Sequence, residues 1–143
     1  MSEQTDPVAA WTRAAEAEAA TAFAYATLGP LLPDEQRTRT VIEMIDHERA
    51  RDDAMSRAVA AGGSIPVLPS AFDIPGPPDS VRGIEAEIGA TLSRLVAVYA
   101  DVVAGLPSGA RRTAIGRALT VTNRALSWQA MPGPWGPEPA PAD

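Results

Sequence analysis

The chain has 143 residues, 45% of them apolar, enough for a single globular domain with its own core. Its formal charge of -6, with twelve arginines and no lysine, argues against nucleic acid or an anionic membrane as a partner, because both attract basic surfaces. No cysteine is present, so disulfides, thiolate metal sites and thiol nucleophiles are excluded. We expect no signal peptide, no membrane span and a cytoplasmic location.

The first helix is predicted from Pro7 to about Leu28. Asp6 can cap its free amides, Pro7 needs no amide partner at the first helical position, and Gly29-Pro30 ends the helix. One face includes the carboxylate of Glu18 among the side chains of Trp11, Ala15, Ala22 and Tyr25. An acid on a core-facing stripe needs a partner, because burying an unpaired charge is unfavourable.

The second helix is predicted from Asp34, its expected cap, to about Ala61, before Gly62-Gly63. At 100° per residue, Glu48 and Asp52 fall on the same side as an apolar stripe. The apolar members of that stripe are Val41, Met44, Ile45, Met55 and Val59. The prediction is therefore that three carboxylates, counting Glu18, point into one interior.

The segment 64–79 contains five prolines and no helical period, so it is predicted to be a linker. Fully extended it would span roughly 50 Å, against roughly 40 Å for the neighbouring helices. It can therefore run the length of a bundle, which favours a ferritin-like crossover between the second and third helices. Its apolar side chains are expected to hold it against the bundle; they are Ile65, Val67, Leu68, Phe72 and Ile74.

The third helix, capped by Asp79 or Ser80, has an apolar stripe without a charge, formed by Val81, Ile84, Ile88, Leu92, Leu95, Tyr99, Val102 and Leu106. A compact turn at 105–109 leads to a fourth helix from about Ser108 to Ala130. Its predicted core face consists of Ile115, Ala118, Leu119, Thr122 and Leu126. The sequence thus predicts an all-α, ferritin-like four-helix bundle.

The bundle is expected to form one domain over residues 1–133, followed by a proline-rich tail, 134–143, that is expected to be disordered.

Inward acids on a four-helix bundle raise the hypothesis of a di-metal carboxylate site. Such a site takes a Glu from each of two helices and a Glu-x-x-His from each of the other two. Glu18 and Glu48 are suitably placed, but Arg51 stands where the histidine after Glu48 is required, and the fourth helix has no acid or histidine. We therefore expect no cofactor. Iron or manganese held by Glu18, Glu48, Asp52 and His47 is the alternative.

The simpler interpretation is that the inward acids pair with arginine, whose guanidinium donors suit buried carboxylates. Arg51, Arg94 and Arg112 are the candidate partners. The predicted structural polar core consists of Glu18, Glu48, Arg51, Asp52 and Tyr99. His47, the single histidine, is placed at the edge of the apolar face and is expected to bond a neighbouring side chain rather than a metal ion.

Several motifs resemble the actinobacterial ferritin-like domains of unknown function. These are Glu18 followed by Phe23 and Tyr25, HERARDDAM at 47–55, SAFDIPGPPD at 70–79, YADVV at 99–103, and Trp128 with AMPG at 130–133. The resemblance runs from about Val8 to Gly133. It implies a ferritin-like bundle with no established activity.

Three positions depart from the pattern of that family. Ala19 stands where the family often has histidine, Glu48 stands where it has histidine, and Ser93 lies where it has an acid. These departures make this chain a poorer candidate for any metal chemistry that the resemblance implies.

The first functional hypothesis is a non-catalytic, metal-free bundle that associates with a second copy, as a dimer, or with a partner protein. Alanine-rich faces, Trp128 and Trp135 motivate it. The second is the metal-binding protein or oxidoreductase described above. A third is a pocket for a small apolar ligand, left by the small side chains of Ala15, Ala22 and Ala118.

Overall fold

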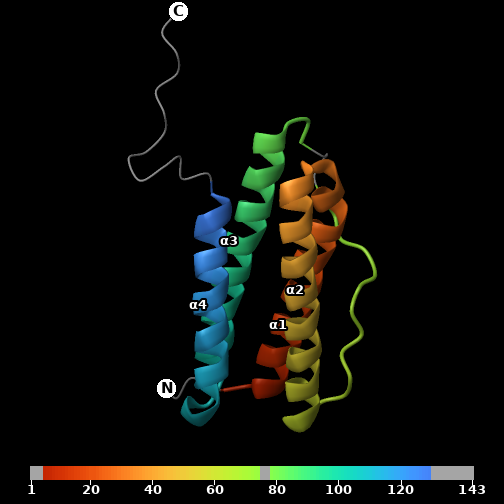
Figure 1. The fold of residues 1–143 in the computed structure, drawn as a ribbon. Coiled ribbons are helices and arrows are strands. Elements are labelled where there is room, and N and C mark those ends of the chain that lie inside the picture. The colour runs from red at the N-terminus through yellow and green to blue at the C-terminus, as the bar shows by residue number, and fades with distance from the viewer. Residues whose placement is uncertain (1–4, 75–77, 130–143) are drawn as a thin grey trace, which may run out of the picture.

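The computed structural model of the protein describes residues 5–74 and 78–129, which form four long helices (Figure 1). Helices α1 (Pro7–Leu28) and α2 (Asp34–Ala60) form one antiparallel pair, and α3 (Val81–Gly105) and α4 (Arg111–Trp128) form the other. The long segment between α2 and α3 runs along the outside of the first pair. The all-α, ferritin-like bundle with a crossover between its second and third helices is confirmed. The predicted tail and Trp135 lie outside the described residues.

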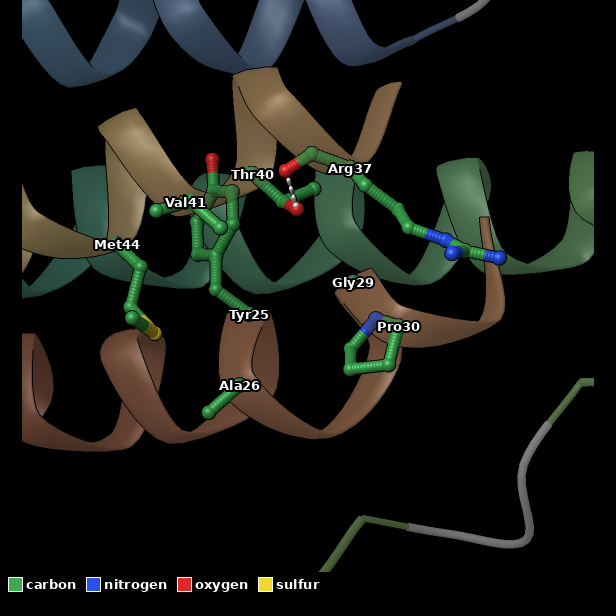
Figure 2. Close-up of a pocket in the computed structure, with 8 residues that line it drawn as sticks. All are labelled: Tyr25, Ala26, Gly29, Pro30, Arg37, Thr40, Val41 and Met44. Carbon is green, nitrogen blue, oxygen red and sulfur yellow. Dashed lines mark hydrogen bonds between the residues drawn. The ribbon is translucent and has the colours of Figure 1, made fainter. Parts of the chain in front are cut away.

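Helix α1 begins and ends as its sequence predicts. The side chain of Asp6 accepts a hydrogen bond from the Ala9 amide at 3.0 Å, and Pro7 is the first helical residue. At Gly29 the chain passes into the 3-10 helix η1 (Gly29–Leu31). A Cβ at Gly29 would lie 2.6 Å from Thr40 Oγ1 of α2, so this glycine permits the close approach of the two helices (Figure 2).

Helix α2 begins one residue earlier than its predicted cap would place it. Pro33 occupies the cap position, and Asp34 is already helical, so the prediction that Asp34 caps the helix is wrong. The Asp34 carboxylate lies 3.3 Å from Arg37 instead. The helix ends before Gly62, whose φ of 105° places it in the left-handed region that glycine adopts without strain.

Helix α3 buries the stripe predicted for it, with one exception. Ser80 caps the helix by accepting a hydrogen bond from the Gly83 amide at 3.0 Å. Val81, in the first turn, is 40% exposed, whereas the rest of the stripe from Ile84 to Leu106 is buried. Helix α3 is long and apolar enough to cross a membrane, a criterion that the core helices of soluble proteins also meet. Here its apolar stripe lies in the core of the bundle.

The crossover segment is attached to the bundle by part of its apolar side chains. Leu68 and Ile74 pack against the core, and the rings of Phe72 and Phe23 lie with centroids 5.7 Å apart. Ile65 and Val67 are 70% and 96% exposed, so the prediction was wrong for these two. In an extended chain successive side chains point in opposite directions, and Leu68 takes the inward direction.

Helix α2 is rotated relative to its predicted orientation. The side chains that it buries are Thr40, His47, Ala54 and Ala58. Three members of the predicted stripe, Val41, Ile45 and Val59, are 51%, 39% and 44% exposed, and only Met44 and Met55 pack against the core. The inward face was missed because its residues are small or polar.

Helix α4 shows the same difference. Its buried residues are Ala114, Val121, Ala125 and Trp128. Ile115, Leu119 and Leu126, predicted to form the core face, are 45%, 62% and 51% exposed. Apart from Val121 and Trp128, both α2 and α4 therefore bury small and polar residues inside the bundle, and their other branched apolar side chains face solvent.

Candidate functional site

Glu18 of α1 lies at the centre of the bundle with its side chain fully buried. Each of the other three helices supplies a side chain that contacts its carboxylate. Tyr99 of α3 donates to Oε1 at 2.7 Å, and Arg117 of α4 donates to Oε1 through Nε at 2.7 Å and to Oε2 through Nη2 at 3.2 Å. His47 Nδ1 of α2 lies 2.6 Å from Oε2. The four helices thus meet at one carboxylate.

The surroundings of Glu18 keep it charged. Burial alone would raise the pKa of its carboxyl, but the hydrogen bonds from His47 and Arg117 outweigh burial and hold that pKa below its ordinary value. Burial and the adjacent carboxylate raise the pKa of Tyr99, so its hydroxyl remains a donor. Burial would lower the pKa of Arg117, but its bonds to Glu18 raise it above the ordinary value.

Arg117 also connects the buried carboxylate to the surface. Its Nη1 lies 2.6 Å from Asp46 Oδ2, which Arg124 Nη1 approaches at 2.8 Å. Arg124 Nη1 also lies 3.1 Å from His47 Nε2. Because the charged carboxylate of Glu18 can only accept, the ring proton is assigned to Nδ1, which donates to Glu18, and Nε2 accepts from Arg124. The approach of Arg117 Nη2 to Nδ1, at 3.0 Å, is then a contact between two donors.

A second carboxylate, Glu43 of α2, continues the network toward the end of α4. Its Oε2 accepts from Tyr25 and from Trp128 Nε1, both at 2.6 Å, and its Oε1 accepts from Arg39 at 2.9 Å. The Arg39 guanidinium lies 4.1 Å from the centroid of the Trp128 ring, and Arg124 Nε is 3.8 Å from Glu43 Oε1. Burial and Glu43 raise the pKa of Tyr25, so this hydroxyl is also a donor.

The interior is therefore a charge-compensated network, which we call the polar core. It pairs the carboxylates of Glu18, Glu43 and Asp46 with the guanidinium groups of Arg39, Arg117 and Arg124. Among the described residues, no buried side-chain nitrogen or oxygen lacks a hydrogen-bond partner. Its groups are thus committed to one another.

Several residues predicted for this core lie elsewhere. Asp52 is exposed and contacts Arg51 at 2.9 Å, and Glu48 is half-buried outside the polar core. His47, predicted at the edge of the apolar face, is fully buried at its centre. The rotation of α2 explains both errors, because His47 and Glu48 lie about 100° apart on the helix.

Of the three predicted arginine partners, Arg51 does contact Asp52, but Arg94 and Arg112 do not pair with the predicted acids. Arg94 contacts Glu87 at 3.1 Å, and Arg112 is exposed. The residues that meet the acids, Arg117 and Arg124, share a stripe of α4 with Ala114, Val121 and Trp128. That stripe recurs with the heptad spacing of packed helices, a signal that would have identified both arginines.

A di-metal carboxylate centre does not fit this arrangement. Over residues 5–74 and 78–129, no group of three or more histidine, aspartate or glutamate side chains is placed to hold a metal ion. Between the carboxylates of Glu18 and Asp46 lies the Arg117 guanidinium, which supplies the positive charge that a cation would otherwise bring.

Acid is expected to weaken the fold through the polar core. The bonds from Arg117 and Arg124 outweigh the burial of Asp46 and lower its pKa from 3.8 to about 2. A depressed pKa gives stability above the unfolded pKa that is lost as pH falls through the folded one, here between about 4 and about 2. Because the Asp46 side chain is 44% exposed, we expect a loss on the order of 1 kcal/mol after solvent screening. Urea unfolding at pH 6, 4, 3 and 2 would measure it. Over the same pH interval, the free energy of unfolding of Asp46→Asn should fall less than that of the wild type. An equal fall in the variant would contradict this role of Asp46.

A pocket of about 320 Å³ lies on the outer side of α1 and α2 (Figure 2). Its polar groups are already engaged: Thr40 donates to the Arg37 carbonyl at 2.7 Å, and Arg37 Nε donates to the Leu32 carbonyl at 2.7 Å. The pocket therefore presents mainly apolar surface. It is not the predicted one, because Ala15 and Ala22 are buried and packed within the bundle.

Comparisons with known proteins agree with the fold. A solved structure of a conserved hypothetical protein from Mycobacterium tuberculosis, Rv2844, superposes with a TM-score of 0.79 over 96% of both chains. At 22% sequence identity this likeness shows the fold alone. The comparison with curated proteins found no match. Residues 10–140 match the family described as "Domain of unknown function (DUF4439)", and since this range is most of the chain, the protein belongs to that family.

Proposed function

We propose that the protein is a metal-free helical bundle that acts by associating with protein surfaces rather than by catalysis. The observation that carries this proposal is the outward direction of the apolar side chains of α2 and α4. Val41, Ile42 and Ile45 of α2 and Ile115, Leu119 and Leu126 of α4 are each at least 39% exposed. Apolar side chains that gather on one face of a helix are typical of interaction surfaces.

The outward face of α4 is uncharged over three turns. Between Thr113 and Asn123 the charged residue is Arg117, and it points inward to Glu18. Gly116, at the same level, has open space around it, so another backbone could approach closely. This face therefore has the apolar character of a helix packed against a neighbour.

The pocket between α1 and α2 extends the outward face of α2. Figure 2 shows Val41 and Met44 on one side of it and Ala26 and Pro30 on the other. Its size and apolar lining suit an aliphatic side chain of a partner. The pocket thus offers a place for a partner's side chain to insert beside the exposed side chains of Val41 and Ile45.

The polar core supports the metal-free part of the proposal. To reach Glu18, a divalent ion would have to displace the Arg117 guanidinium and leave it buried without its carboxylate. Separating a buried pair in this way is strongly unfavourable. The alternative of iron or manganese bound to Glu18, Glu48, Asp52 and His47 is further disfavoured because Asp52 points to solvent.

Native mass spectrometry tests both parts together. The protein is produced with iron and manganese supplied and is purified without chelator. We expect assemblies with masses that are multiples of the 14.9 kDa chain and no added metal. Leu119→Glu or Ile45→Glu should reduce assembly, whereas Ala9→Glu, on the exposed side of α1, should not. A monomer carrying stoichiometric metal that is lost in Glu18→Ala would contradict the proposal.

A further inference from the structure

The outward face of α2 has an apolar centre bordered by charges of opposite sign. Val41, Ile42 and Ile45, near the middle of the helix, are 51%, 64% and 39% exposed. Arg37 lies toward the N-terminal end of the face and Asp52 toward the C-terminal end, with side chains 54% and 66% exposed. Each charge has a partner within its own copy, Asp34 for Arg37 and Arg51 for Asp52, but Arg37 and Asp52 both keep more than half of their side-chain surface exposed to a second copy.

These charges match those of an inverted copy of the same helix. Arg37 and Asp52 lie about two turns on either side of Ile45 and on the same edge of the face. In an antiparallel pair that crosses at Ile45, each Arg37 meets Asp52 of the other copy.

We propose that the protein forms a homodimer in which α2 packs antiparallel against α2 of a second copy, with the two-fold axis beside Ile45. This inference rests on the association proposed above and names the partner as a second copy of this chain. A two-fold interface brings the same patch of both copies together, so Ile45 packs against its counterpart. The opposed charges at the two ends set the register of the helices.

Exposed apolar residues beyond the two ends of the face fit the same arrangement. Leu31, just before α2, is 52% exposed, and Val59 and Ile65, at its other end, are 44% and 70% exposed. An antiparallel dimer carries Leu31 of one copy toward Val59 and Ile65 of the other. A hollow of about 420 Å³ lined by Met55, Val59 and Ile65 lies there to receive it.

Other pairings of these faces lack this complementarity. A parallel pair of α2 helices would place Arg37 against Arg37 and Asp52 against Asp52, which is repulsive. The outward face of α4 is uncharged over its central turns and so specifies no register.

Because the chain contains no cysteine, single-cysteine cross-linking tests the dimer directly. Ile45→Cys in the full chain should give a covalent dimer with a short bifunctional maleimide, since the two cysteines lie across the two-fold axis. Ala9→Cys is the matched control: it is also an exposed apolar position, but it lies on α1, away from both outward faces, and should give little covalent dimer. Circular dichroism would verify that both variants fold.

The outcomes separate this inference from the one on which it rests. If native masses show assembly but Ile45→Cys does not cross-link, or if both variants cross-link equally, association stands and the α2 pairing is overturned. If the wild-type chain is a monomer and neither variant cross-links, both proposals are overturned.

A charge reversal tests the register. Arg37→Asp should weaken dimerisation roughly threefold to tenfold, because like charges then meet at both ends of the interface. Adding Asp52→Arg should restore the affinity. Sedimentation over a range of concentrations measures the dissociation constants. Failure of the double variant to recover would overturn the antiparallel register.

Discussion

Arg117→Met is expected to lower the free energy of unfolding by about 3–5 kcal/mol, the range found when one member of a buried ion pair is removed. The substitution keeps an unbranched apolar side chain in place of the arginine stem but removes the guanidinium that bonds Glu18 and Asp46. The fully buried carboxylate of Glu18 then keeps only Tyr99 and His47 as partners. Urea denaturation at pH 7 would measure the loss.

Two further variants identify the cause of that loss. Arg112→Met, at an exposed position of the same helix, should change stability by less than about 0.5 kcal/mol. Combining Arg117→Met with Glu18→Gln should recover part of the loss, because a neutral amide needs no counter-charge. A loss below about 1 kcal/mol for Arg117→Met alone would show that Glu18 is not stabilised through this pair.

Trp128→Ala is expected to be similarly destabilising, by about 3–5 kcal/mol. The indole is 1% exposed, packs edge-on against Tyr25 at 6.2 Å between centroids, and donates to Glu43. Its removal leaves a cavity and also withdraws the aromatic surface beneath the Arg39 guanidinium. Thermal or urea unfolding would show the effect.

Trp128→Phe separates packing from hydrogen bonding. It retains an aromatic ring but withdraws one donor from Glu43, so we expect a loss of about 1–3 kcal/mol. Leu126→Ala, at a 51% exposed position two residues away, should cost less than about 1 kcal/mol in the monomer. Equal losses for Trp128→Ala and Leu126→Ala would contradict the buried role of the indole.

The fold was predictable because the strongest local signals agree with the tertiary structure. Three local signals match the structure: the capping residues Asp6 and Ser80, the ends of α1, and the apolar stripe that α3 buries. The length of the segment between α2 and α3 predicted a crossover along the bundle rather than a tight turn, and the structure has that crossover (Figure 1). These features depend on residues close together in the chain, so a single sequence is sufficient to recognise them.

The orientations of α2 and α4 were not predictable in the same way. Hydrophobic periodicity gives weight to large side chains, yet α2 buries Ala54 and Ala58, and α4 buries Ala114 and Ala125, where helices approach closely. Apart from Val121, the valines, leucines and isoleucines of these helices are instead exposed. Where a helix has apolar residues on two faces, the helices that pack against it decide which face is buried.

The candidate site was predictable only in part: of its members, the sequence placed Glu18 and Tyr99 together in the core. Glu18 was placed inside, and the need for a partner followed from the unfavourable burial of a charge. Its partner Arg117 is far away in the sequence, and their meeting depends on how α4 docks against α1 and α2. No pattern within one helix contains that information, so Arg94 and Arg112 were equally plausible partners.

The meeting of four helices at Glu18 has a consequence for how the bundle folds. Along the packed α1–α3 seam, a slip of one turn, about 5.4 Å, would still place apolar side chains against each other. The same slip would carry Tyr99 away from Glu18 and leave part of the buried carboxylate without a donor. Misdocked arrangements are therefore raised in free energy by the loss of a polar contact rather than of apolar area, which widens the gap between the native bundle and its nearest competitors.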